Sequence, residues 1–433
     1  MTNTRLVNNF FLAVIHDHII SYPTPKNLSY HWSFGALSGI CLIIQILSGL
    51  FLSMHYVPDI NLAFASVEHI MRDVNNGWLV RYIHSNGASM FFFVIFFHIF
   101  RNIYFGSYLY PRIQLWISGI VIFFLLMAIA FMGYVLPWGQ MSFWGATVIT
   151  NLFSAIPIYG STIVEWLWGG FSVDQATLNR FYSFHFFLPF ILAAVAFIHL
   201  ALLHNVGSSD PLSLDSNTSS VHPAMINFFP YFYVKDLYAT FIFLFIFSYF
   251  VFFIPNVLGH PDNYIEANSM VTPAHIVPEW YFLPFYAILR SIPNKLGGVI
   301  AMVLSILSLL AFPLFNSNKK APIFRNIYTF IIWVFASNFI LLGWIGQQPV
   351  EEPFTTIGMF CTIFYFSIIF FILPILSFFS NFTYNFKILS LYFNILQELL
   401  NELPTYYRFS SNKLIVIFNA YLEKLKKIYE NLF

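Results

Sequence analysis

The chain has 433 residues, of which 59% are hydrophobic and only 9% are charged, and its formal net charge is +1. This composition excludes an ordinary soluble protein, because apolar runs recur along the whole length and leave few charges for a solvated surface. We therefore expect a polytopic membrane protein that lies in a lipid bilayer and has no nucleic-acid partner.

Eight segments are near or above the length of about 20 apolar residues that a helix needs to cross a bilayer. In chain order they are 33–56, 79–106, 113–136, 181–204, 229–254, 297–315, 324–345 and 355–380. The sequence thus predicts an all-α fold with eight transmembrane helices, joined by short and moderately long connections.

The distribution of positive charge predicts the orientation of these helices. If the N-terminal residues lie on side one and each helix crosses to the other side, all but five of the 19 Lys and Arg residues fall on side one. The five on side two are Arg72, Arg81, Arg180, Arg290 and Lys295. By the positive-inside rule, side one is the matrix or the cytoplasm.

Two histidine pairs stand in the second and fourth predicted helices. His84 and His98 are fourteen residues apart, and so are His185 and His199. Fourteen residues rise about 21 Å and make nearly four full turns, so both histidines of a pair share one helix face. One helix separates the two histidine helices, which makes them parallel. His84 then comes level with His185, and His98 with His199.

This arrangement predicts metal ligands. Intramembrane ionisable groups are costly and usually functional, and imidazole is a ligand of haem iron. We therefore predict two non-covalent b-type haems, each held by two histidines. The chain has only two cysteines, Cys41 and Cys361, and no C-x-x-C-H sequence, which excludes a covalent c-type haem and a disulfide scaffold.

Glycines in the first and third predicted helices repeat the same spacing. Gly35 and Gly49 are fourteen residues apart, as are Gly119 and Gly133. A residue without a side chain lets a flat macrocycle or a second backbone approach closely. Glycine is also common in membrane helices, but two such pairs beside two histidine pairs favour a four-helix haem-binding bundle.

Three arginines lie close in sequence to the histidines, namely Arg81, Arg101 and Arg180. Haem propionates are anionic and point toward water, so an arginine at a helix end can pair with them. The same location also suits an arginine that only sets the orientation of its helix. Both interpretations stay open for each of the three.

Three stretches of the chain resemble the cytochrome b subunit of quinol:cytochrome c oxidoreductase, the bc1 complex or complex III of mitochondria and bacteria. Residues 77–89 resemble the start of the first histidine helix of that family. Residues 133–145 and the sequence Pro-Glu-Trp-Tyr at 278–281 resemble its quinol-oxidation pocket. The resemblance extends from about residue 30 to residue 378.

The resemblance implies site residues on side two. Glu279, Tyr281 and Tyr134 match the catalytic part of the quinol-oxidation pocket, and Gly145 matches its binding part. A carboxylate here has a physical use, because Glu279 could accept a proton from a quinol hydroxyl. The alternative for Glu279 is a loop carboxylate that caps a helix or binds water.

On side one the resemblance implies a quinone-reduction pocket that contains His204, Ser208, Lys235 and Asp236. A histidine and an aspartate on either side of a quinone could hydrogen-bond its two carbonyls and deliver protons. A solvated loop with ordinary charges is the alternative, because such loops vary freely.

The activity that the resemblance implies is oxidation of ubiquinol at one face and reduction of ubiquinone at the other, through the two b haems and coupled to proton translocation. The implied partners are the Rieske iron-sulfur protein and cytochrome c1, within a homodimeric complex of the mitochondrial inner membrane. Two alternatives remain: a transmembrane di-haem reductase of the ferric or ascorbate type, and a proton-coupled transporter.

The sequence divides into four predicted parts. Residues 1–32 form an N-terminal matrix-side segment, and residues 33–227 form the four-helix haem bundle with its loops. Residues 228–380 form a C-terminal membrane domain of four helices that includes 278–281. Residues 381–433 carry apolar positions at helical spacing, which predicts an amphipathic matrix-side extension.

Overall fold

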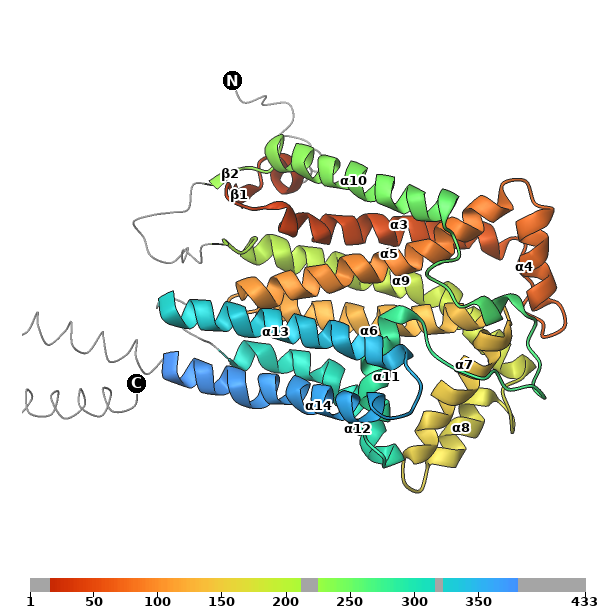
Figure 1. Ribbon diagram of the computed structural model, residues 1–433. Helices are drawn as coiled ribbons and strands as arrows, with labels where there is room; N and C mark the ends of the chain where they lie inside the picture. Colours follow the sequence, from red (N-terminus) through yellow and green to blue (C-terminus); the bar gives the residue numbers. More distant parts are fainter. Residues whose placement is uncertain (1–15, 212–224, 316–321, 381–433) are drawn as a thin grey trace, which may run out of the picture. The chain divides into compact units, whose positions relative to one another are not determined.

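The structure is a computed structural model that describes residues 16–211, 225–315 and 322–380 (Figure 1). The predicted extension at 381–433 lies outside these residues. The chain divides into two compact units, residues 1–314 with 331–369, and residues 315–330 with 370–433. Everything described below belongs to the first unit unless stated.

Long helices make up most of the described residues. They are α3 (Ser33–Ser53), α5 (Gly77–Phe105), α6 (Ile113–Val135), α9 (Gln175–Val206), α10 (Tyr231–Phe253), α12 (Lys295–Leu307), α13 (Pro322–Gln347) and α14 (Phe354–Ser367). Helix α13 contains the boundary between the two units. Shorter helices lie in the connections: α4 (Ala63–Arg72), α7 (Gln140–Thr150), α8 (Gly160–Trp168) and α11 (Leu283–Arg290).

Eight helical spans among the described residues are long and apolar enough to cross a membrane. They are Tyr30–Ser53, Gly77–Phe105, Ile113–Val135, Gln175–Val206, Tyr231–Phe253, Lys295–Leu314, Asn326–Gln347 and Phe354–Ser380. The predicted number of transmembrane helices and the predicted all-α fold class are confirmed.

The start of α9 lies six residues before the predicted boundary. The apolar pattern predicts a start at residue 181, whereas the helix begins at Gln175. Asp174 caps the helix, and its side chain and that of Thr177 form a reciprocal capping box. The first turns are polar, so a search for apolar residues misses them. Because of these additional turns, α9 extends past its apolar span on side two.

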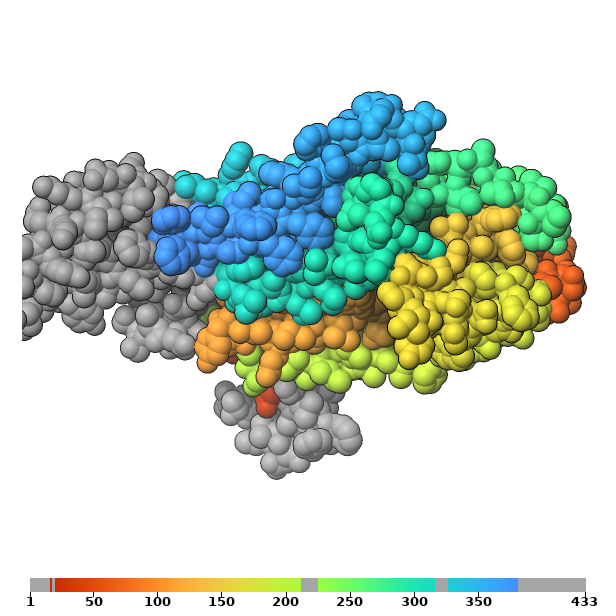
Figure 2. All heavy atoms as spheres, turned by 90° about the horizontal axis from the view of Figure 1, so that it is seen from below, coloured from red at the N-terminus to blue at the C-terminus, as the bar shows by residue number. Residues whose placement is uncertain are grey.

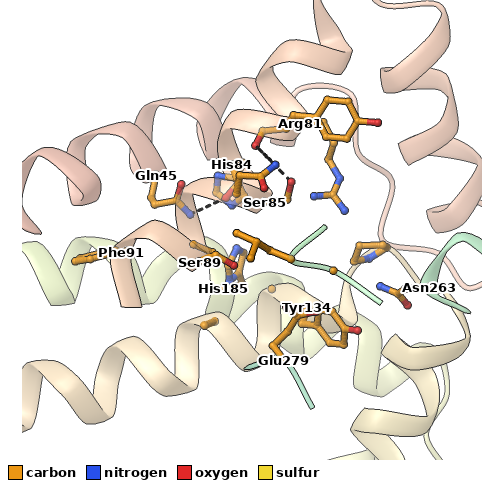
Figure 3. A pocket seen from close by; sticks show the side chains of 18 of the residues that line it. Gln45, Arg81, His84, Ser85, Ser89, Phe91, Tyr134, His185, Asn263 and Glu279 are labelled. Atoms are coloured by element: carbon orange, nitrogen blue, oxygen red, sulfur yellow. Dashed lines mark hydrogen bonds between the residues drawn. The ribbon is translucent and has the colours of Figure 1, made fainter. Parts of the chain in front are cut away.

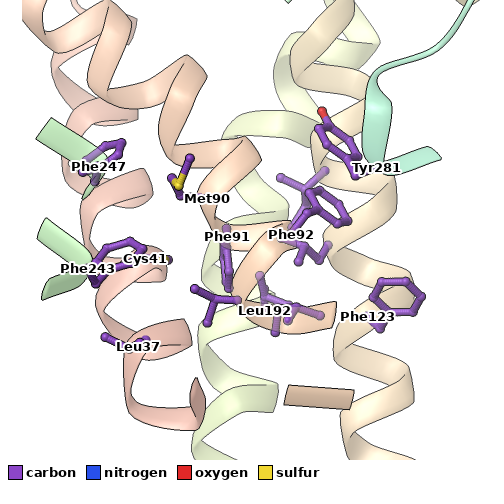
Figure 4. Close-up of a cluster of buried hydrophobic side chains, with 14 of the residues drawn as sticks. Leu37, Cys41, Met90, Phe91, Phe92, Phe123, Leu192, Phe243, Phe247 and Tyr281 are labelled. Atoms are coloured by element: carbon purple, nitrogen blue, oxygen red, sulfur yellow. The ribbon is translucent and has the colours of Figure 1, made fainter. Parts of the chain in front are cut away.

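Four helices form the bundle that positions the candidate site. Helix α3 packs along α5 and helix α6 along α9, and α10 lies against α3 and α5 (Figure 1). Large apolar side chains fill the middle of the bundle, including Leu126 on α6. Figure 4 shows two others, Phe91 on α5 and Leu192 on α9. Each of these three residues is seven positions from both histidines or both glycines of its helix. An apolar layer therefore separates the two histidine levels.

The two ends of the bundle carry different connections. At one end β1 (Pro23–Pro25) pairs antiparallel with β2 (Met225–Asn227), and this end is side one. Helices α4, α7 and α8 lie at the opposite end, side two (Figure 1). The space-filling view shows the segment around α7 and α8 in yellow at this end (Figure 2). The segment before α11, which contains the sequence at 278–281, also lies on side two.

Candidate functional site

The first histidine level lies toward side two. The imidazole rings of His84 on α5 and His185 on α9 face each other with centroids 6.1 Å apart and planes at 85° (Figure 3). A Cβ atom at Gly49 would lie 3.1 Å from Cε1 of His84, and one at Gly133 would overlap the His185 ring. Both glycines thus lie directly against an imidazole ring of the neighbouring helix at this level.

The second level repeats the arrangement toward side one. A Cβ atom at Gly35 would lie 3.3 Å from Cε1 of His98, and one at Gly119 would lie 3.3 Å from Cε1 of His199. The structure therefore places every glycine of the fourteen-residue pattern against a histidine of the other pattern. Each level combines two histidines and two glycines from four different helices.

The distance between His84 and His185 fits a metal ion that both could bind. With metal–nitrogen bonds of about 2 Å, two imidazoles on opposite sides of one ion have ring centroids about 6 Å apart. The Nδ1 atom of His185 lies 2.8 Å from the carbonyl oxygen of Ile129. A carbonyl only accepts, so the proton is on Nδ1 and the Nε2 lone pair is available as a ligand.

Two of the three arginines lie close to the histidines. Arg81 lines the same cavity as His84 and His185. Arg101 is next to His98, with Nη2 3.4 Å from Nδ1 and its guanidinium 5.0 Å from the centre of the Trp32 ring. Its Nε atom is buried without a hydrogen-bond partner. A buried donor of this kind suits an anionic group such as a propionate.

Arg180 points elsewhere. Its exposed guanidinium donates to the main-chain carbonyls of Trp166 and of Leu167 at the end of α8, the latter at 3.3 Å. Cations stabilise the C-terminal end of a helix, so this contact accounts for the side chain. The structure brings Arg81 and Arg101 to the histidines but not Arg180.

A cavity opens beside the first histidine level. Its wall includes Arg81, His84, His185, Tyr134 and Glu279 (Figure 3). Tyr281 also lines it. The cavity thus combines two of the predicted metal ligands with the three side chains predicted to be catalytic. They come from α5, α6, α9 and the segment before α11, which are far apart in the sequence.

Glu279 has an unusual acid–base equilibrium in this wall. Burial raises the pKa of its carboxyl group to about 7, and the neighbouring Tyr134 hydroxyl and Arg81 guanidinium partly oppose the rise. The Tyr134 hydroxyl is itself buried and makes no hydrogen bond of good geometry. A carboxyl group with this pKa can both take up and release a proton near neutral pH.

Two contacts from α5 hold the segment that carries Glu279. The indole nitrogen of Trp280 donates to the hydroxyl of Ser89 at 3.1 Å, and the Tyr281 ring stacks on Phe92 with centroids 4.0 Å apart. Sequence analysis missed Ser89 and Phe92, although both follow His84 in its own helix. Their contacts with residues 278–282 become apparent only from the packing of this segment on α5.

The loop before this segment also contributes. Asn263 lines the cavity, and its Oδ1 atom accepts from the main-chain nitrogen of Ser142 at 2.9 Å. This contact joins the loop to α7. Gly145 lies further along α7, and a Cβ atom there would meet no heavy atom within 4 Å. The space beside Gly145 is open, and the residue is not part of the cavity wall.

Three of the four residues predicted on side one contact the N-terminal segment or the start of α3. His204 packs on the Tyr22 ring at 4.7 Å between centroids. Lys235 donates to the carbonyl of Leu28 and lies 4.9 Å from the centre of the Tyr30 ring. Residues 22–30 thus connect α9 with α10, and sequence analysis did not predict these contacts.

The other two of these residues also have defined contacts. Asp236 interacts through its carboxylate with the hydroxyl of Ser33 at the start of α3. Ser208 takes part through its main chain, because its carbonyl accepts from Nη2 of Arg112 at 3.1 Å. Ser33, like Tyr22, belongs to the missed contacts of the N-terminal region.

Comparison with known proteins gives matches along most of the chain. The family model "Cytochrome b/b6/petB" matches residues 19–207, and "Cytochrome b(C-terminal)/b6/petD" matches residues 266–366. Cytochrome b of Chondrus crispus is 58% identical over 385 residues, which cover 89% of this chain and 100% of the relative. Cytochrome b of Triticum aestivum is 60% identical over 366 residues, which cover 84% and 90%.

A solved structure described as a hyperthermophilic respiratory complex III contains a similar chain. The two chains superpose with a TM-score of 0.81 at 33% sequence identity, and the match covers 88% of this chain and 99% of that one. The similarity therefore holds for the fold as well as for the sequence.

Proposed function

The chain belongs to the cytochrome b family of respiratory complex III, and from this premise we propose that it oxidises ubiquinol on side two, reduces ubiquinone on side one and carries electrons between the two sides. The observation that carries the proposal is the pair of histidine levels, each with two glycines in contact with the imidazoles. Membership of this family leaves no support for a ferric or ascorbate-type reductase or for a transporter.

The proposed cofactors are two b-type haems. His84 and His185 would hold one, and His98 and His199 the other, with Arg81 and Arg101 paired with the propionates. When bound, such a group supplies a carrier of single electrons at each level. The glycines of this chain leave room for a flat macrocycle on both of its faces, and the apolar layer separates the two levels.

We expect the two arginine positions to differ in effect. Arg101→Leu should lower the haem content at the His98/His199 level, because a buried guanidinium there has an unsatisfied Nε. Arg180→Leu should leave both haems in place, because this guanidinium binds the end of α8. Haem extraction from the two purified variants measures the difference. Equal loss of haem in both variants would contradict this assignment of Arg101.

The proposed proton chemistry on side two uses Glu279. A quinol that gives up two electrons also gives up two protons, and the Glu279 carboxylate can accept one of them. The buried hydroxyl of Tyr134, which lies beside the Glu279 carboxyl group, can hydrogen-bond the bound quinol. Trp280 and Tyr281 hold the segment against α5 and so keep the carboxyl group at the cavity wall.

The proposed chemistry on side one is the reverse. His204 and Asp236 would hydrogen-bond the quinone carbonyls and pass on protons from the matrix, together with Lys235 and Ser208. The contacts of Tyr22, Leu28 and Ser33 support this role, since they hold α9, α10 and the N-terminal segment together.

The proposal includes partner subunits. The only two cysteines, Cys41 and Cys361, supply neither an iron-sulfur site nor a covalent haem site. We propose that each quinol gives one of its two electrons to this chain and the other to the Rieske iron-sulfur protein and then cytochrome c1. We also propose a homodimeric assembly and the mitochondrial inner membrane as the location.

A pH profile tests the role of Glu279. Only the carboxylate form accepts a proton, and with a pKa of about 7 this form is lost as the pH falls through neutrality. We expect quinol:cytochrome c turnover of the assembled complex to fall as the pH is lowered through about 7. In Glu279→Gln, turnover should be about 100-fold lower and this step should disappear. An unchanged profile in the variant would exclude Glu279 as the acceptor.

A further inference from the structure

A serine hydroxyl contacts one histidine at the first level. Ser48 on α3 precedes Gly49, and both residues face His84: the serine Oγ atom lies 3.0 Å from Nδ1. The same Oγ atom lies 2.6 Å from the carbonyl oxygen of Ile44. A hydroxyl has one hydrogen, and the carbonyl can only accept it. Ser48 therefore accepts a hydrogen bond from the Nδ1–H group of His84.

The second level contains the same arrangement on a different pair of helices. Ser118 on α6 precedes Gly119, and its Oγ atom lies 2.8 Å from Nδ1 of His199. This hydroxyl donates to the carbonyl of Leu115 at 2.9 Å. Ser118 is thus also an acceptor, and the Nε2 atom of His199 keeps its lone pair.

The other two histidines lack this contact. Phe34 and Met132 precede Gly35 and Gly133, so neither position offers a hydroxyl. His185 uses the main-chain carbonyl of Ile129 instead. Each level thus has one histidine bound to a serine, on α5 at the first level and on α9 at the second.

We propose that Ser48 and Ser118 are positioning residues that fix the tautomer and orientation of one axial ligand at each level and tune the reduction potential there. The inference rests on the proposed function, in which His84 and His199 are iron ligands. An acceptor on Nδ1–H makes the imidazole more basic, and a more basic ligand favours the oxidised metal. Loss of the hydroxyl should therefore raise the reduction potential at its own level.

A purely structural role makes a different prediction. Serine in membrane helices often bonds the carbonyl four residues earlier, with no further function. In that case, removal of either hydroxyl would change helix stability but neither reduction potential.

The experiment is a potentiometric titration of the b-haem absorbance in the assembled complex, for Ser48→Ala and Ser118→Ala. We expect Ser118→Ala to raise only the potential of the haem at His98/His199, and Ser48→Ala only that at His84/His185. Each variant is thus the control for the other. Ser118→Thr keeps a hydroxyl and should restore the wild-type potential. The variants His84→Leu and His98→Leu assign each potential to its level.

The outcomes separate the two proposals. Absence of b-haem absorbance from the wild-type complex would contradict the proposed function. Two normal haems with potentials that stay unchanged in both alanine variants, or a shift of the same haem in both, would overturn the inference alone. If Ser118→Ala does not assemble, Ser118→Cys, a weaker acceptor, should shift the same potential in the same direction.

Discussion

Replacement of Gly133 by alanine is expected to remove the haem from the His84/His185 level and leave the other in place. The new Cβ atom would overlap the His185 ring, which the carbonyl of Ile129 holds at Nδ1. Either the imidazole or α6 must move, and a ligand displaced in this way no longer binds the iron in the required geometry. Haem extraction and the reduced-minus-oxidised spectrum of the purified complex measure the loss.

Gly39 is the matched control for this prediction. It also lies in a helix of the bundle, but a Cβ atom there would meet no heavy atom within 4 Å. Gly39→Ala should therefore keep both haems. Retention of both haems in Gly133→Ala as well would mean that clearance at the histidine is not what the glycine provides.

The second large effect is expected from the histidines themselves. His98→Leu should lose the haem on side one and keep the one on side two, and His84→Leu should do the reverse. The reason is that the apolar layer of Phe91, Leu126 and Leu192 separates the levels, so each histidine serves one site. Loss of both haems from either variant would contradict two independent sites, provided that the variant still assembles.

The helix repeat made the histidine levels predictable from the sequence. A spacing of fourteen residues fixes which residues share a helix face, and the single helix between the two histidine helices makes those two parallel. These two facts were enough to predict that His84 faces His185. The spacing alone did not determine that each glycine contacts a histidine. This contact depends on how α3 packs on α5 and how α6 packs on α9.

Contacts between distant segments could not be predicted in the same way. The N-terminal segment reaches α9 through Tyr22 and α10 through Leu28, and no local pattern signals either contact. The direction of Arg180 is another such case. Its position before His185 made a propionate one of two possible partners, whereas in the structure its guanidinium donates to two main-chain carbonyls at the end of α8. Long side chains choose partners from tertiary packing, which a single sequence does not contain.

The measurement that tests the central claim most directly is the haem stoichiometry of the purified wild-type complex, from extracted haem and a potentiometric titration of the b-type absorbance. We expect two non-covalent b haems per chain, with two separate reduction potentials. A single haem, or none, would contradict the assignment of His84 with His185 and His98 with His199 as two sites.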